Sequence, residues 1–377
     1  MEQIYLDNSA TTKMIDSAID AMLPHFKESF ANSSSVYKIG KENKKEIEKA
    51  RETIKSSIGA NLAREIYFTS GGTEANNWVL KSFAKQNNHI ITSTIEHHSV
   101  LNTLKFLERQ GVSITYLPVD KNGFVKPENL EKAIKDDTAL ISIMLANNEI
   151  GTIQPIRELV NIANKHNILF HTDAVSALGH IPINIKQLGV DFLTISAHKA
   201  YGPKGIGALY ARNGIEFDSF MHGGSQERGR RAGTESVPLI IGFAKALEIC
   251  INDMALEEKK LRKITESFIN KILFSIDGVS LNGDFSNRLA NIVNLSFENI
   301  NGEDLLIMLD REGFICSSGS ACAAGSLEFS HVLTALGKYE DSGSLRISLG
   351  RFNKEDDLEK LIPVLIRIIQ KLRSIVK

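Results

Sequence analysis

The sequence predicts an α/β protein with two domains, a large one built on a mainly parallel sheet of seven strands and a smaller α+β one. Two observations predict this class. Between about residues 60 and 215, short apolar runs alternate with amphipathic stretches, the pattern of strands joined by crossover helices. After about residue 238 that alternation ends. Long charged stretches that favour helix take its place, together with a few isolated apolar runs.

The elements follow in chain order from these patterns. The predicted strands of the large domain are residues 65–69, 89–93, 113–118, 139–144, 168–172, 192–196 and 207–210, and the predicted helices are 74–86, 98–110, 127–134 and 156–166. Pro127 and Pro155 stand where a first helical turn tolerates proline. A long helix is expected over 238–276, strands over 290–297 and 344–348, and a closing helix over 354–375 that Pro363 should kink.

We expect the large domain to comprise residues 14–250, and the small domain to comprise residues 1–13 and 251–377. Lys and Arg total 44 against 45 Asp and Glu, a net charge of −1, which argues against binding nucleic acid or membranes through a basic surface. The 3 cysteines cannot form a disulfide framework, which favours a reducing compartment. No apolar run approaches the roughly 20 residues of a membrane span, so a cytoplasmic protein is expected.

Three motifs lie at predicted strand ends, where ligands bind in parallel sheets. TSGGTE (69–74) places glycines and Thr73 before a helix, which suits an anion, although an ordinary glycine-rich N-cap turn is the competing interpretation. HTDA (171–174) ends in an acid, Asp173, which either caps a helix or holds a proton on a heterocyclic nitrogen. SAHK (196–199) ends in Lys199, which is either a partly desolvated nucleophile or a surface lysine.

The three motifs share one explanation. An anion site, a carboxylate for a ring nitrogen and a lysine for a Schiff base are what pyridoxal 5'-phosphate (PLP) requires of a protein. The chain supplies them in order, each at a strand end, so the joint pattern is far more specific than any single motif.

A fourth motif, SSGSACAAGS (317–326), predicts an exposed loop with a cysteine at its centre, Cys322. Cys250 lies in an apolar helical stretch and is expected to be buried packing, whereas the place of Cys316 is left open. No Cys-x-x-Cys pair or clustered His and Cys spacing supports a metal site.

With these residues in view, the chain resembles the cysteine desulfurases of the NifS/IscS class, PLP enzymes of fold type I and the class V aminotransferase family. The resemblance runs from YLDNSATT (5–12) to LRISLGRF (345–352). Between these ends it rests on TSGGTEANN (69–77), IEH (95–97), ANNEIGTIQPI (146–156), HTDAV (171–175), SAHKAYGPKGIG (196–207), GGSQERGRRAGTE (223–235) and SSGSACAAGSLE (317–328).

The resemblance implies a role for each matching residue. Lys199 would bind the cofactor, His97 would stack on its ring and assist proton transfer, and Asp173 would pair with its ring nitrogen. Asn148 would lie near the cofactor's phenolic oxygen and the substrate carboxylate, which Arg346 would clamp. The remaining implied cofactor-binding residues are Gly72, Thr73, Ser196 and His198 around the phosphate, Ser176, and Thr234 reaching the phosphate of a partner subunit.

The implied reaction converts L-cysteine to L-alanine and leaves a persulfide on Cys322. Its sulfur would pass to an iron–sulfur scaffold protein or a tRNA-thiolating enzyme, and the chain is expected to be a homodimer. Ser176 departs from the family pattern, which has glutamine there, and Phe329 replaces a proline after the cysteine loop. Three alternatives stay open: a selenocysteine lyase or cysteine sulfinate-type enzyme on the same scaffold, a non-catalytic subunit of a sulfur-transfer assembly, and a plain aminotransferase.

Overall fold

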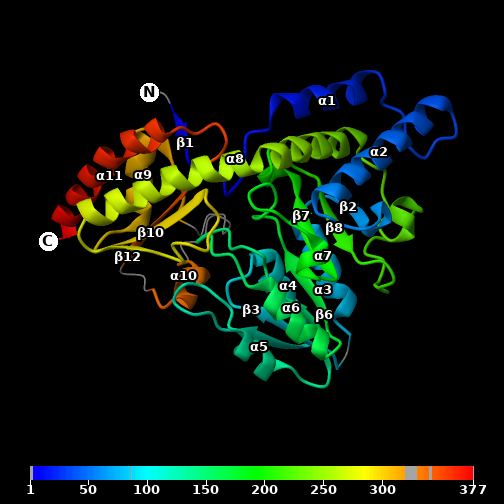
Figure 1. Ribbon diagram of the computed structural model, residues 1–377, viewed down its shortest axis with the longest axis horizontal. Helices are drawn as coiled ribbons and strands as arrows, with labels where there is room; N and C mark the ends of the chain where they lie inside the picture. The colour runs from blue at the N-terminus through cyan, green and yellow to red at the C-terminus, as the bar shows by residue number, and fades with distance from the viewer. Residues whose placement is uncertain (1–2, 86, 319–328, 339–341, 377) are drawn as a thin grey trace.

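The computed structural model describes residues 3–85, 87–318, 329–338 and 342–376 (Figure 1). Its main sheet has seven strands in the spatial order β2-β8-β7-β6-β5-β3-β4. Strands β3 to β7 pair in parallel, whereas β8 runs antiparallel to both β7 and β2. The predicted mainly parallel seven-stranded sheet is therefore confirmed. The strands are β2 (Ile66–Thr69), β3 (His89–Ser93), β4 (Ser113–Leu117), β5 (Thr138–Ser142), β6 (Leu169–Asp173), β7 (Phe192–Ser196) and β8 (Gly207–Ala211).

Helices alternate with these strands as the sequence pattern predicts. The α6 helix shows why, since its buried Ile156, Leu159, Val160 and Ala163 recur at the spacing that forms one apolar helical face. The predicted helices are confirmed as α3 (Gly72–Phe83), α4 (His98–Glu108), α5 (Pro127–Ala133) and α6 (Ile156–Lys165), and a short α7 (Ile185–Leu188) adds to them. The α3 helix begins two residues earlier than predicted because its first turn includes the glycine pair.

Two further helices near the N-terminus, α1 (Asp16–Lys27) and α2 (Lys38–Ser57), pack against the long helix α8 (Val237–Ser275) (Figure 1). The sequence prediction missed both of them. The signal was present in α2, whose buried Ile47, Ala50 and Ile54 recur at helical spacing in a charged stretch. The prediction of a long helix over 238–276 is confirmed by α8.

The C-terminal part contains a three-stranded antiparallel sheet, which α8, α9 and α11 cover (Figure 1). The predicted strands at 290–297 and 344–348 and the closing helix are confirmed, with small shifts at their ends. The elements are β9 (Val279–Leu281), β10 (Ile292–Glu298), α9 (Gly302–Arg311), α10 (His331–Ala335), β12 (Ser342–Ser348) and α11 (Glu355–Val376). A separate parallel pair joins β1 (Ile4–Tyr5) to β11 (Phe314–Ile315).

The two halves of α8 belong to two different hydrophobic cores. Phe243 and Leu247 pack into the core beneath the main sheet, whereas Phe268 and Ile272 pack with the three-stranded sheet and α11. Leu6 also belongs to the second core. We therefore propose that residues 14–250 form the large domain and that residues 1–13 and 251–377 form the small domain. Among the described helices, none is long and apolar enough to cross a membrane.

Candidate active site

A cavity of about 230 Å³ opens at the carboxyl ends of β6 and β7, beside the N-terminus of α3. This is the position at which parallel sheets bind ligands, because strand ends and helix N-termini converge there. Nine of the predicted site residues line the cavity together: Gly72, Thr73, His97, Asn148, Asp173, Ser176, Ser196, His198 and Lys199.

The floor of the cavity is a glycine turn that presents the N-terminus of α3. Gly71 has φ +154° and no side chain to cap the helix, so the first N–H groups of α3 remain available to an anion. A Cβ on Gly72 would lie 2.7 Å from Val175 Cγ2, so a larger residue would have to displace that side chain. The turn therefore presents backbone N–H groups that suit an anion, and Thr73, Ser196 and His198 line the same cavity, while anion binding here stays a prediction.

Asp173 lies at the end of β6 and is almost completely buried. Its Oδ1 accepts a hydrogen bond from Val175 N at 2.9 Å, and its Oδ2 accepts one from Asn76 Nδ2 at 2.7 Å. Asp173 therefore caps the turn that follows β6 and also lines the cavity, while its pairing with a ring nitrogen stays a prediction. The two donors fix the orientation of the carboxylate at the cavity wall.

Lys199 ends the short 3₁₀ helix that follows β7 and is 9% exposed. Its Nζ donates a hydrogen bond to the carbonyl oxygen of Ser9 at 2.6 Å. The alternative of a surface lysine is therefore wrong. An amine buried beside a carboxylate in a ligand-sized cavity is suited to form a covalent bond with a carbonyl carbon.

The turn after Lys199 has an unusual backbone. Tyr201 has φ +57°, a conformation that a bulky residue adopts only when its surroundings enforce it. Its N–H donates to Thr12 Oγ1 at 3.0 Å, and its hydroxyl accepts from Arg351 N at 2.8 Å. These contacts connect the lysine turn to the N-terminal segment and to the small domain.

His97 is the N-cap residue of α4, and its Nδ1 accepts a hydrogen bond from Ser99 N at 3.1 Å. Burial lowers the pKa of His97 to about 4, although Asp173 acts in the opposite direction. The ring is therefore neutral at pH 7, and because Nδ1 accepts the hydrogen bond from Ser99 N–H, the ring proton resides on Nε2. Burial and the positive charge of Lys199 likewise lower the pKa of His198 to about 4.

Arg346 lies on β12, is 1% exposed, and stands next to the cavity rather than in its lining. Its Nη2 donates to Asp7 Oδ1 at 2.8 Å, and its Nη1 donates to the carbonyl oxygen of Asn148 at 3.2 Å. Its buried Nε has no hydrogen-bond partner among the described residues. The structure thus brings the two predicted substrate-binding residues, Arg346 and Asn148, into contact.

Among the described residues, Thr234 is the predicted cofactor-binding residue that does not line this cavity. Thr234 lies outside the cavity, in a second one of about 160 Å³ between the main sheet and the loop before α8. Cys322 lies outside the described residues. Of the other cysteines, Cys250 is buried packing as predicted, with its thiol 3.3 Å from the carbonyl oxygen of Ala200. Cys316 packs partly buried against the small-domain core, and burial raises the pKa of its thiol.

Several residues around the cavity were missed from sequence. Asn76 lies one helical turn after Thr73, so the spacing alone could have placed it on the same face of α3. Ser99 orients His97 from two residues away and could have been found in the same manner. Ser9 had no such local signal, since its bonding partner Lys199 is 190 residues away in the chain.

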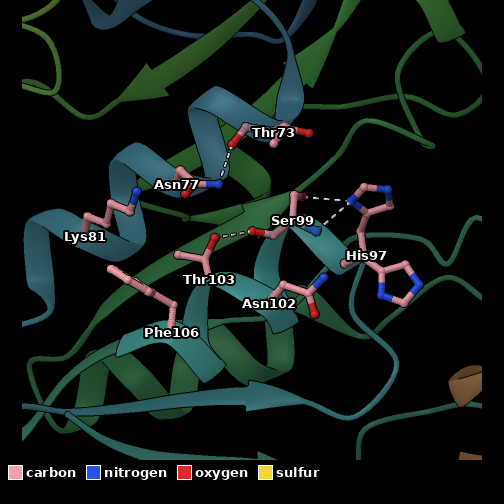
Figure 2. Close-up of a pocket in the computed structure, with 9 residues that line it drawn as sticks. Thr73, Asn77, Lys81, His97, Ser99, Asn102, Thr103 and Phe106 are labelled. Carbon is pink, nitrogen blue, oxygen red and sulfur yellow. Dashed lines mark hydrogen bonds between the residues drawn. The ribbon is translucent and has the colours of Figure 1, made fainter. Parts of the chain in front are cut away.

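An open surface groove of about 470 Å³ adjoins the cavity between α3 and α4. It shares Thr73, His97 and Ser99 with the cavity, and Figure 2 shows Lys81 and Phe106 at the opposite end from His97. Through the described part of the chain, no group of three or more His, Cys, Asp or Glu side chains is placed to hold a metal ion.

Comparisons with known proteins agree with this geometry. The aminotransferase class-V family model matches residues 4–361. The chain is 52% identical over 377 residues to a protein of Methanosarcina thermophila named cysteine desulfurase IscS, covering 98% of this chain and 93% of the relative. It is 51% identical to a protein of the same name from Dictyoglomus turgidum, covering 99% and 96%.

Solved structures are similar over nearly the whole fold. A structure described as a NifS-like protein superposes with a TM-score of 0.92 at 38% sequence identity. The match covers 98% of this chain and 100% of that one. A structure described as SspA in complex with cysteine has a TM-score of 0.81 at 36% identity, covering 93% of this chain and 99% of its own.

Proposed function

Because the chain belongs to the class V aminotransferase family, with relatives named cysteine desulfurase over its whole length, we propose that it is a PLP-dependent cysteine desulfurase. In this reaction L-cysteine and the thiol of Cys322 give L-alanine and a persulfide on Cys322. The C–S bond of the substrate breaks, a sulfur–sulfur bond forms, and protons complete the methyl group of alanine. No other oxidant or reductant is needed.

The observation that carries this proposal is the buried amine of Lys199 in one cavity with the Asp173 carboxylate and the uncapped N-terminus of α3. These three groups fit the aldehyde, ring nitrogen and phosphate of PLP. When bound, PLP supplies an electron sink that stabilises negative charge on the substrate carbon. Asp173 would keep a proton on the ring nitrogen, and Thr73, Ser196 and His198 would bind the phosphate.

The site also offers proton carriers of its own. The Lys199 amine lies inside the cavity and would remove and return protons at the substrate carbon once it is not covalently bound. The neutral ring of His97 presents its Nε2 proton, since Ser99 occupies Nδ1. His97 would donate a hydrogen bond through this N–H to a reacting group rather than act as a cation.

Arg346 and Asn148 would bind the substrate carboxylate. The guanidinium already holds Asp7 and the Asn148 carbonyl, while its buried Nε–H lacks a partner among the described residues. An unpartnered buried donor on a cation favours an incoming carboxylate. A relative whose structure is described as a complex with cysteine agrees with this substrate.

The described residues on either side of the Cys322 segment contact this same region. Ser317 exchanges backbone hydrogen bonds with Arg346 at 2.6 and 3.2 Å, and Ser330 donates to Glu149 at 2.6 Å. Both attachment points are therefore beside the residues assigned to the substrate. This supports Cys322 as the thiol that receives sulfur.

The persulfide would then pass to an acceptor protein, either an iron–sulfur scaffold or a tRNA-thiolating enzyme. We also propose a cytoplasmic homodimer in which Thr234, which does not line the Lys199 cavity of its own chain, completes the phosphate site of the partner.

The decisive experiment incubates the purified protein with L-cysteine and measures alanine by chromatography together with the mass of the Cys322 peptide. Equal early yields of alanine and of a Cys322 peptide heavier by one sulfur are expected. A Cys322→Ala variant should retain cofactor absorbance and release no sulfide. A variant with Cys250→Ala, which removes a buried thiol that does not line the cavity, serves as the matched control. Normal sulfide release by Cys322→Ala would contradict the assigned thiol.

A further inference from the structure

We propose that Ser9 is a positioning residue that couples the Lys199 amine to the substrate-carboxylate residues Asn148 and Arg346. This inference rests on the proposed function, because it concerns how that active site is aligned. Ser9 is 5% exposed and belongs to the N-terminal segment, which crosses from the small domain to the lysine turn.

Three short hydrogen bonds meet at Ser9. Its carbonyl oxygen accepts from Lys199 Nζ at 2.6 Å, and its hydroxyl donates to the carbonyl oxygen of Asn148 at 2.6 Å. Its backbone N–H donates to Ser348 Oγ at 2.7 Å. Ser9 thus forms hydrogen bonds with Lys199, with the Asn148 loop and with β12, the strand that carries Arg346.

The Asn148 carbonyl is the point where the two substrate-binding residues are joined. It accepts from Ser9 Oγ on one side and from Arg346 Nη1 on the other. Removing the Ser9 hydroxyl leaves this buried carbonyl with a longer bond of 3.2 Å to Arg346 as its remaining described contact. The position of the Asn148 carbonyl, and with it that of the Arg346 guanidinium, is then less well fixed.

The neighbouring residues support a role in alignment rather than in packing alone. Ala10 lines the cavity directly, so a shift of Ser9 moves the cavity wall. Thr12 bonds to the backbone of His198 through both its N–H and its hydroxyl, at 3.0 and 2.9 Å. The segment from Ser9 to Thr12 therefore follows the cofactor-binding turn along its length.

A Ser9→Ala variant removes the Asn148 bond and keeps both backbone bonds. The matched control is Ser82→Ala, which removes an equally buried serine hydroxyl bonded to the carbonyl of Trp78 in α3. A Ser9→Thr variant retains the hydroxyl. Thermal unfolding midpoints of all variants establish that each one folds.

The measurement is the equilibrium binding of L-alanine and of ethylamine, which is alanine without its carboxylate, followed by the visible absorbance of the PLP-loaded protein. Ser9→Ala should weaken L-alanine binding by about tenfold, the loss typical of one buried hydrogen bond, and leave ethylamine binding unchanged. Ser9→Thr should restore L-alanine binding, and Ser82→Ala should bind both ligands as the wild type does.

The inference is overturned if Ser9→Ala weakens the binding of L-alanine and of ethylamine equally. It is also overturned if Ser9→Ala binds L-alanine as tightly as Ser82→Ala does. Should Ser9→Thr not fold, the comparison of Ser9→Ala with Ser82→Ala decides alone. The proposed function fails separately, if the wild type forms no alanine from L-cysteine. If the wild-type protein binds L-alanine no more tightly than ethylamine, the role of Ser9 is refuted as well.

Discussion

Replacing Arg346 with lysine tests the assignment of the substrate-carboxylate site. The guanidinium uses Nη2 for Asp7 and Nη1 for the Asn148 carbonyl, which leaves its buried Nε–H for the substrate. A lysine ammonium directs its donors from a single point and cannot reproduce this planar fork. Asp7 would retain the ammonium, so the substrate carboxylate would lose its partner.

The lost interaction is a hydrogen bond between charged groups, worth about 1.5–3 kcal/mol, which corresponds to a KM for L-cysteine raised by roughly 10- to 160-fold. The assay is the initial rate of alanine formation over a range of L-cysteine concentrations. The matched control is Arg288→Lys, because Arg288 is also 1% exposed but bonds to backbone carbonyls and Thr265. If both variants show the same KM, the carboxylate assignment of Arg346 is refuted.

Two further predictions concern Lys199 and Glu96. Lys199→Ala should lack the visible absorbance of covalently bound PLP, as a spectrum of the purified variant would show; wild-type absorbance would contradict the Schiff-base role. Burial raises the pKa of Glu96 from 4.5 to about 8, which favours its neutral form in the folded protein. The wild type should therefore lose stability as pH rises between these values, and Glu96→Gln should remove that loss, on the order of a few kcal/mol. Thermal unfolding midpoints at pH 5 and pH 9 measure this, and an identical pH dependence in both proteins would refute it.

Most strands and helices could be predicted because their signals are local. Apolar runs of strand length and amphipathic stretches mark β3 and β7 at the same residues in sequence and structure. The missed helix α2 had the same kind of signal, so that failure lay in the interpretation rather than in the chain. The glycine turn before α3 and the lysine turn after β7 were likewise readable from adjacent residues.

The sequence by itself determined the chemical parts of the site and their order along the chain, since residue type and strand ends are local properties. Only the tertiary structure decided which distant groups meet, as when Asp7 pairs with Arg346 across 339 positions and Ser9 with Lys199 across 190. It also decided the neutral state of His97, because burial depends on everything packed around the ring. Hydrogen bonds between remote segments and desolvation are collective properties of the fold, so no local pattern specifies them.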